Sequence, residues 1–291
     1  MTAATDLVLL QVSIDDILEA DPTSAEHALR TAAQRGMFQR LLDAPGTPPL
    51  NADPHAAALV DVLSRLGRWA TAAQLARVAE AMRIWSLGRL WQGANLVARA
   101  RPDLNLATAL RISASGMSVN ASLFEIVSGY HLEAEELAAP AVRALTEMAR
   151  QLCAWDNDIG SWSKESIRGT ADQHLVGVLA GRDGRTLEQA FAEAVALRNQ
   201  TMGLFVLLRE QTAGAASPAL RRYLGELGLM IAAVLDFTVV STRYRDVPTG
   251  SAVPIAARMR IDARSHEPDA GTAPAIPTIA WWWDCLESDG R

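Results

Sequence analysis

The sequence predicts an all-α protein built as a large helical bundle. Ala, Leu, Arg and Glu favour helices and dominate the chain, and apolar residues recur at three- and four-residue steps. No run alternates apolar and polar residues for long enough to indicate a β-sheet, and Gly or Pro marks the gaps between helical stretches. The expected helical stretches are residues 24–43, 54–101, 138–165, 171–180, 185–213 and 217–245.

Two stretches are apolar on most sides, which is typical of inner helices in a large bundle. They are LVLLQVSI, residues 7–14, and MIAAVLDFTVV, residues 230–240. A stretch such as 7–14 is much shorter than the roughly 20 residues of a membrane helix, and the start of the chain lacks the basic region of a signal peptide. We therefore expect no membrane segment and a cytoplasmic location.

The composition indicates one large domain followed by a tail. With 291 residues, of which 49% are apolar and 21% charged, the chain can bury a large core. We expect that domain in residues 1–245. From about residue 246 the composition shifts to Pro, Ala, Ser and Asp, so residues 246–291 are expected to form a mobile or loosely docked tail. The tryptophans Trp281 to Trp283 are expected to dock on the body or over a pocket mouth.

Charge and cysteine content exclude several functional classes. A net charge of −6 argues against a nucleic-acid surface. Cys153 and Cys285 are the only cysteines and lie far apart, so the chain has neither a disulfide framework nor zinc-finger spacing. We expect them to be buried apolar residues or free thiols.

A polar helix face stands out in the stretch WDNDIGSWSKE, residues 155–165. The helical period places Asn157, Ser161 and Glu165 at successive four-residue steps, so their side chains lie along one face over about 12 Å. One amide, one hydroxyl and one carboxylate suit a Mg2+ ion that keeps some waters and takes other ligands from phosphate. The alternative is a helix N-terminus capped by Asp156 or Asn157, with Ser161 on a solvated face.

A second acidic cluster ends the first apolar stretch. Asp15, Asp16 and Glu19 close the run LVLLQVSIDDILEAD, and carboxylates at the end of a buried helix are unfavourable unless a cation lies there. The alternative is an ordinary solvated helix end. If this helix faced the one that carries Asn157, the two would hold Mg2+ on a diphosphate, whose charge must be neutralised as it leaves.

Together these residues resemble a known family, the bacterial class I terpene synthases. DDILE is similar to the family's aspartate-rich motif, and NDIGSWSKE to its (N/D)DxxSxxxE metal motif. The family also carries a diphosphate-sensing arginine upstream of the second motif and an Arg-Tyr pair downstream, and Arg111 and Arg243-Tyr244 stand at similar separations. Four elements in register are more specific than any one of them. The implied fold is the all-α isoprenoid synthase bundle with a central apolar cavity.

The resemblance implies a role for each matching residue. The implied metal ligands are Asp15, Asp16, Glu19, Asn157, Ser161 and Glu165, which would hold three Mg2+ ions. The implied diphosphate ligands are Arg111, Lys164, Arg243 and Tyr244, and the implied catalytic residues are Arg111, Ser115 and Tyr244. A guanidinium binds phosphate in bidentate fashion, and an ammonium and a phenol add single donors. Lys164 is also the only lysine among the 27 Lys and Arg residues.

The resemblance further implies a helix break close to Arg111. It places a linker at Ala114 and a helix-break effector at Ser115, beside Gly116, where a backbone carbonyl would point at the nascent cation. The alternative is an ordinary turn. Aromatic side chains are expected to line the cavity and stabilise carbocations, although each also fits a plain core position. The candidates are Phe124, Trp155 and Phe237.

The chain departs from the family's pattern at three points. The family usually has an aromatic residue in place of Gly160 and a tryptophan in place of Phe237. Family members also carry several helices before the aspartate-rich motif, which here begins at Asp15. We therefore expect the chain to be shorter than its functional unit at the N-terminus.

The resemblance implies a magnesium-dependent terpene cyclase that acts on a linear prenyl diphosphate, with farnesyl diphosphate favoured over shorter, longer or methylated substrates. The alternatives are an inactive, truncated relative and an unrelated helical interaction module. A homodimer is an open expectation, and neither nucleic acid nor membrane is an expected partner.

Overall fold

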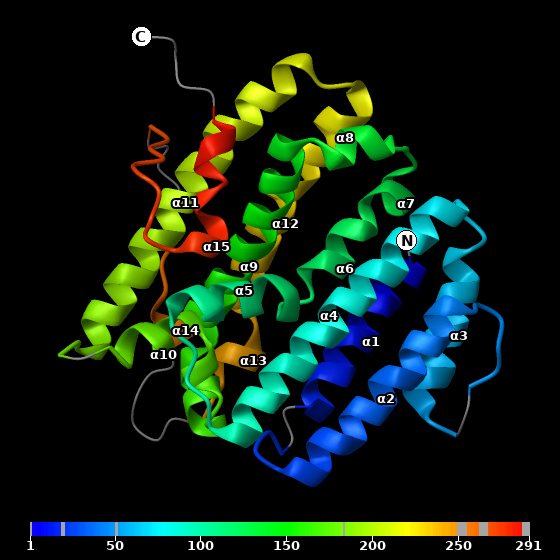
Figure 1. Ribbon diagram of the computed structural model, residues 1–291, viewed down its shortest axis with the longest axis horizontal. Helices are drawn as coiled ribbons and strands as arrows, with labels where there is room; N and C mark the ends of the chain where they lie inside the picture. The colour runs from blue at the N-terminus through cyan, green and yellow to red at the C-terminus, as the bar shows by residue number, and fades with distance from the viewer. Residues whose placement is uncertain are drawn as a thin grey trace. The chain divides into compact units, whose positions relative to one another are not determined.

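The computed structural model describes residues 2–18, 21–49, 52–182, 184–248, 255–261 and 267–286. Every regular element in these ranges is helical, which confirms the predicted all-α class (Figure 1). The chain forms two compact units, and each is described by itself. Unit 1 comprises Met1–Ala100 and Ser113–His131, and unit 2 comprises Arg101–Ile112 and Leu132–Arg291.

Unit 1 is a set of helices, and side chains cap the starts of α2, α3 and α4. Its helices are α1 (Thr2–Leu18), α2 (Ala25–Asp43), α3 (Pro54–Leu66), α4 (Ala72–Ala98), α6 (Met117–Ser122) and α7 (Phe124–Ser128). The Ser24 hydroxyl caps α2 and the Asp53 carboxylate caps α3. The single helical stretch predicted over 54–101 is wrong, because Thr71 and Gln74 form a capping box that starts a new helix after Leu66.

The core of unit 1 forms where α1 packs on α3 and α2 packs on α4. Leu7 and Ile14 of α1 are fully buried, as are Phe38 of α2 and Leu59 of α3. The apolar side chains of residues 7–14 therefore contribute directly to this core, as the sequence predicted.

Unit 2 is organised around one long helix, α9 (Pro140–Arg168), which packs against both α11 and α12 (Figure 1). Leu145, Met148, Leu152 and Trp155 repeat at helical spacing on α9 and are fully buried. Trp155 is thus a core residue, in agreement with the plainer of its two interpretations. The other helices of unit 2 are α8 (Ala134–Ala138), η1 (Ala171–Gln173), α10 (Leu175–Ala180), α11 (Leu187–Ala215), α12 (Pro218–Val240), α13 (Thr242–Arg245), α14 (Ile255–Arg258), α15 (Pro277–Ala280) and η2 (Trp283–Cys285). α5 (Leu104–Ala114) begins in unit 2 and ends in unit 1.

One helix of unit 2, α12, bears on the expectation that the chain has no membrane segment. By length and composition alone, α12 is apolar enough to cross a membrane, a test that core helices of soluble proteins also pass. It packs against α9, and the expected absence of a membrane segment stays a prediction.

Both cysteines are free thiols, as expected, and burial raises the pKa of the Cys153 thiol far above its usual value.

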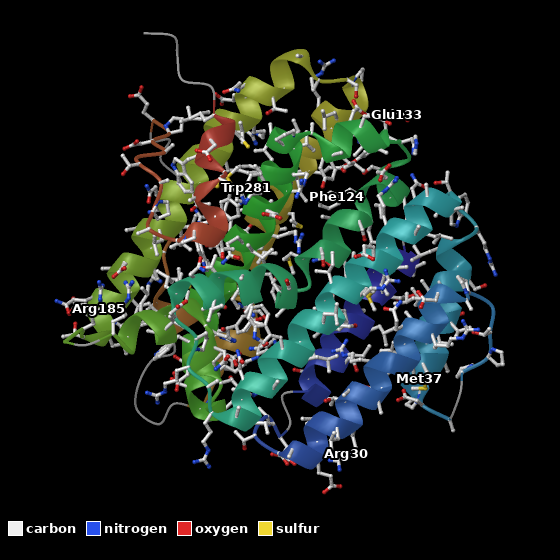
Figure 2. All side chains as sticks on the ribbon, viewed as in Figure 1. Arg30, Met37, Phe124, Glu133, Arg185 and Trp281 are labelled. Carbon is white, nitrogen blue, oxygen red and sulfur yellow. The ribbon has the colours of Figure 1, made fainter. Side chains whose placement is uncertain are left out.

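The described part of the C-terminal segment is packed on unit 2. Trp282 is fully buried and its indole nitrogen donates to Glu147 Oε2 at 3.1 Å, while the Thr278 amide donates to Asn105 Oδ1 at 2.8 Å. Trp281, labelled in Figure 2, lies 5.9 Å from the Arg143 guanidinium. The predicted docking of the tryptophans is therefore confirmed for Trp282, and the mobility of residues 246–291 stays a prediction.

Gly203 of α11 tests this packing, because a Cβ there would overlap the backbone carbonyl of Asp269. Gly203→Ala is expected to lower the free energy of unfolding by about 1–3 kcal/mol through overpacking. Gly214→Ala on the same helix meets nothing within 4 Å and is expected to stabilise by about 0.5–1 kcal/mol. Chemical denaturation of both variants provides the measurement, and equal effects would contradict the docking of residues 267–271 on α11.

Candidate active site

The predicted oxygen-rich face exists on α9 in the interior of unit 2. Asn157, Ser161 and Glu165 occupy successive turns of this uninterrupted helix. Ser161 is 1% exposed and Glu165 is 3% exposed, so the alternative of a solvated helix N-terminus is wrong. The Ser161 hydroxyl has no hydrogen-bond partner in the described part of the chain. A buried hydroxyl without a partner is unfavourable, which is a reason to expect a ligand there.

Tyr244 joins this face from α13. Its hydroxyl oxygen accepts a hydrogen bond from Asn157 Nδ2 at 2.9 Å, which leaves the amide oxygen of Asn157 for a cation. The Ser241 hydroxyl caps α13 by accepting from the Arg243 amide at 3.2 Å. Phe237 packs edge-to-face on the Tyr244 ring, with centroids 6.0 Å apart. The predicted Arg-Tyr pair therefore contributes its tyrosine directly to the metal-motif helix.

Glu165 is held as a charged carboxylate. Burial alone would raise its pKa, but the nearby His174 and Lys164 charges and hydrogen bonds from Thr170 and Lys164 lower the pKa to about 2. Lys164 Nζ lies 2.9 Å from Glu165 Oε1 and 5.9 Å from the centre of the Tyr244 ring. Glu165 is therefore ionised at neutral pH, as a metal ligand must be.

Arg111 of α5 meets a residue that the sequence analysis did not single out. Its Nη2 lies 2.7 Å from Oδ1 of Asp158, which is fully buried on α9. Oδ2 of Asp158 accepts the Leu175 amide at 2.9 Å, and His174 Nδ1 lies 3.8 Å from Oδ1. Asp158 belongs to the stretch NDIGSWSKE, residues 157–165, but its hydrogen-bond and ion-pair partners become apparent only in the folded structure.

The aspartate-rich cluster lies at the end of α1 in unit 1. Asp15 Oδ1 lies 2.8 Å from Arg89 Nε of α4, Asp16 is half-buried, and Glu19 lies outside the described residues. Behind this pair, the Arg35 guanidinium stacks 4.1 Å from the Trp85 ring, and burial, reinforced by the Arg89 charge and opposed by Asp15, lowers the Arg35 pKa to about 9.

The predicted helix break is present. α5 ends at Ala114, and α6 begins after Gly116, which has a φ of +79°. A side chain at Gly116 would overlap Gln11, whose amide donates to the Gly116 carbonyl at 3.2 Å. Across from the break, a Cβ on Gly88 of α4 would lie 2.6 Å from the Ala114 nitrogen. Close packing of glycine on both sides therefore fixes the break, whereas the role of Ser115 stays a prediction.

Gly160 lies on α9 between Asn157 and Ser161, and the packing around it leaves no room for a larger side chain. A Cβ at Gly160 would overlap Thr238 of α12 and lie 3.2 Å from Met259 Sδ. The residue after α14 therefore occupies space next to the metal-motif helix, and the Ile255 amide donates to the Ser163 hydroxyl of α9 at 3.1 Å.

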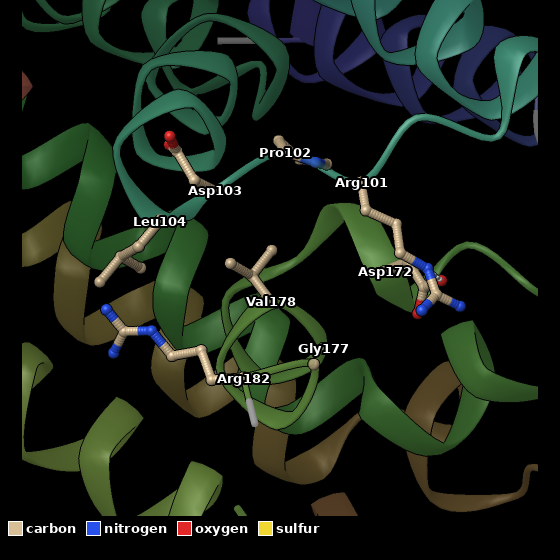
Figure 3. A pocket seen from close by; sticks show the side chains of 9 residues that line it. Arg101, Pro102, Asp103, Leu104, Asp172, Gly177, Val178 and Arg182 are labelled. Carbon is tan, nitrogen blue, oxygen red and sulfur yellow. Dashed lines mark ion pairs between the residues drawn. The ribbon is translucent and has the colours of Figure 1, made fainter. Parts of the chain in front are cut away.

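A separate pocket of about 280 Å³ lies elsewhere in unit 2 (Figure 3). It contains none of the predicted site residues. Its two arginines are already paired, Arg101 with Asp172 at 3.0 Å and Arg182 with Glu193 at 2.9 Å, which leaves the pocket little net charge with which to attract a phosphate. The lining residues are Arg101, Pro102, Asp103, Leu104, Asp172, Gly177, Val178, Gly181 and Arg182.

Comparison with known proteins identifies the family. The model of terpene synthase family 2, C-terminal metal binding, matches residues 6–203. The chain belongs to this terpene synthase family. It is 37% identical over 273 residues to bonnadiene synthase of Allokutzneria albata, covering 93% of this chain and 74% of that relative.

Two further likenesses agree. The chain is 37% identical over 256 residues to (+)-T-muurolol synthase ((2E,6E)-farnesyl diphosphate cyclizing) of Streptomyces clavuligerus, covering 84% of this chain and 58% of that relative. The crystal structure of the SVS_A2 protein from ancestral sequence reconstruction superposes with a TM-score of 0.78 at 28% identity, covering 97% of this chain and 78% of that chain. The isoprenoid synthase helical fold and the resemblance to bacterial class I terpene synthases are thus confirmed.

This terpene synthase is therefore a terpene cyclase that acts on a prenyl diphosphate, and its family implies a divalent-metal site. The residues of α9 fit such an ion. Among the described residues the buried Ser161 hydroxyl has no hydrogen-bond partner, the Asn157 amide keeps its oxygen for a cation, and the Glu165 carboxylate is ionised. These are hard oxygen ligands of the kind that Mg2+ prefers.

Gly160→Ala tests the packing of the metal-motif helix. The added methyl overlaps Thr238, so we expect a loss of about 1–3 kcal/mol in the free energy of unfolding and faster amide exchange in residues 255–261. Gly225→Ala on α12 meets nothing within 4 Å and serves as the control. If Gly160→Ala is as stable as the control, α9 and α12 do not approach as closely as described.

Proposed function

We propose that this terpene cyclase uses Mg2+ to ionise farnesyl diphosphate and closes the resulting cation to a cyclic sesquiterpene hydrocarbon or alcohol. The observation that carries the proposal is the buried face of α9. There the Ser161 hydroxyl, which has no hydrogen-bond partner among the described residues, lies between the Asn157 amide and the ionised Glu165 carboxylate. In the reaction the C–O bond breaks and its electron pair leaves with the diphosphate. The π electrons of a double bond then attack the carbocation to close the ring, and the cyclic cation either loses a proton or takes up water, which then loses a proton.

Three Mg2+ ions are proposed, held by two sets of side chains. Asn157, Ser161 and Glu165 form one set, and Asp15 with Asp16 and Glu19 forms the other. Mg2+ supplies the positive charge that stabilises the leaving diphosphate. Asp15 is paired with Arg89, so metal binding by Asp15 competes with this ion pair.

The diphosphate contacts are proposed for Arg111, Lys164, Arg243 and Tyr244. Lys164 and Tyr244 adjoin the metal face, since Lys164 contacts Glu165 and Tyr244 contacts Asn157. An ammonium and a phenol hydroxyl donate hydrogen bonds that strengthen as the oxygen gains charge. The proposed role of Ser115, as effector at the break after Arg111, is to present backbone dipoles to the cation.

The substrate proposal rests on the relatives. One of them is named as cyclising farnesyl diphosphate, and a more distant one, 30% identical, is named diterpene cyclase DtcycA. Farnesyl diphosphate is therefore the first substrate to test, and geranylgeranyl diphosphate is the second. The central apolar cavity, a cytoplasmic location and a homodimer stay predictions.

The metal ligands make the first functional test. We expect chelation to abolish turnover and Mg2+ to restore it, and we expect Asn157→Ala or Glu165→Ala to reduce kcat/KM by about 10²-fold or more, because each removes a metal ligand. Exposed residues of the same type, Asn199→Ala and Glu188→Ala on α11, are the matched controls. Full turnover by Asn157→Ala and Glu165→Ala would remove the α9 face from the mechanism.

The substrate makes the second test. Each prenyl diphosphate is incubated with the protein and Mg2+, released diphosphate is assayed, and volatile products are separated by gas chromatography. Farnesyl diphosphate is expected to yield a cyclic product at the highest kcat/KM. A preference for geranylgeranyl diphosphate would contradict the sesquiterpene proposal and leave the cyclase assignment intact, whereas no product from any substrate would favour the inactive alternative.

A further inference from the structure

Asp158 ties three helices of unit 2 together. From α9, its Oδ2 accepts the Leu175 amide at the start of α10, and its Oδ1 lies 2.7 Å from Arg111 Nη2 of α5. The His174 ring approaches the same oxygen at 3.8 Å. Asp158 is fully buried, so its charge is tolerable only because these groups surround it.

A second buried ion pair on α9 provides an internal comparison. Arg198 of α11 forms a bidentate ion pair with Asp156. Its Nε donates to Oδ1 at 2.8 Å and its Nη2 donates to Oδ2 at 3.1 Å. Such a fork uses both carboxylate oxygens and the edge of the guanidinium that carries Nε and Nη2. The pair between Arg198 and Asp156 is therefore closed, as suits a purely structural contact.

The pair between Arg111 and Asp158 is open, in the sense that only one guanidinium nitrogen contacts the carboxylate. The Leu175 amide occupies Asp158 Oδ2, so Arg111 reaches the carboxylate through one nitrogen, and its Nε has no hydrogen-bond partner in the described part of the chain. Arg111 is only 5% exposed, and a buried N–H group without a partner is costly. The arrangement holds the guanidinium by one end and keeps a donor edge unsatisfied.

We propose that Asp158, with His174 beside it, is a positioning residue that holds Arg111 by one nitrogen so that the remaining edge of the guanidinium binds a phosphate oxygen of the substrate. The proposal rests on the diphosphate role proposed above for Arg111. Asp158 itself touches neither substrate nor metal. It acts by reducing the freedom of a long side chain, which lowers the entropy lost when that side chain binds.

The test measures the affinity of the full chain for inorganic diphosphate, with excess Mg2+, by isothermal titration calorimetry. Asp158→Asn keeps an acceptor for the Leu175 amide and removes the charge that holds Arg111, and we expect diphosphate affinity to fall about tenfold or more. In the Arg111→Ala background the same substitution should change nothing further, because Asp158 acts through Arg111. Asp156→Asn, which opens the closed pair, is the matched control and should leave the affinity unchanged.

The outcomes separate this proposal from the proposed function. If Arg111→Ala binds diphosphate as tightly as the unsubstituted chain, the role of Arg111 fails and this proposal with it. If Arg111→Ala weakens binding while folded Asp158→Asn does not, or tightens it, only the positioning role is overturned. Should Asp158→Asn fail to fold, His174→Asn replaces it, with a smaller loss of affinity expected that again disappears in the Arg111→Ala background; its persistence there would overturn the proposal.

Discussion

The need to compensate every charge that α9 carries into the interior governs the arrangement of unit 2. Buried carboxylates are unfavourable unless other groups surround them, and those on α9 recruit partners from helices that are distant in sequence. Asp156 is met by Arg198 of α11, Asp158 by Arg111 of α5, and Glu165 by Thr170 just beyond the helix. The same contacts that make the burial tolerable fix α5, α10 and α11 around the metal motif, so stability and site geometry have a common origin.

Some buried polar atoms lack a hydrogen-bond partner in the described residues, both inside and outside the predicted site. The Ser161 hydroxyl and Arg111 Nε are buried without a hydrogen-bond partner in the described residues, and in unit 1 the three guanidinium nitrogens of Arg35 share this property. In the pair of Asp156 and Arg198, by contrast, both carboxylate oxygens accept a hydrogen bond. Partly satisfied groups are costly to folding. Ser161 and Arg111 lie on or beside a motif that the family uses for metal and diphosphate, where unfavourable burial is expected to be retained, whereas others, such as Gln151, lie outside these motifs.

The features predicted correctly from the sequence are those that follow from local helical periodicity, and most of the features that were missed depend on contacts between residues distant in the sequence. The helical class, the buried face of α9 and the break near Gly116 follow from spacing of three to four residues and from glycine, which are local properties. The end of α3 at Leu66 was missed because apolar periodicity continues through it, although Thr71 and Gln74 form a recognisable capping box. The partnership of Asp158 with Arg111 and His174 has no signal in spacing, since only the packing of α5 and α10 on α9 creates it. The docking of Trp282 was expected from the tryptophan cluster, but its partner Glu147 was not, because that contact joins residues 135 positions apart in the sequence.

Gly160 shows how a departure from the family pattern is balanced elsewhere in the chain. Without a side chain at this position, α9 approaches Thr238 of α12 closely, and Met259 fills the space beside it. The amide of Ile255 also bonds to Ser163 on the neighbouring turn. An aromatic residue at position 160 would supply bulk from α9 itself, whereas here the segment after α14 supplies it from the other end of the sequence. Because interiors are close-packed, an aromatic side chain at position 160 and the side chain of Met259 cannot occupy the same space. The metal-motif helix of this chain therefore depends on residues 255–259 for packing that its own sequence does not provide.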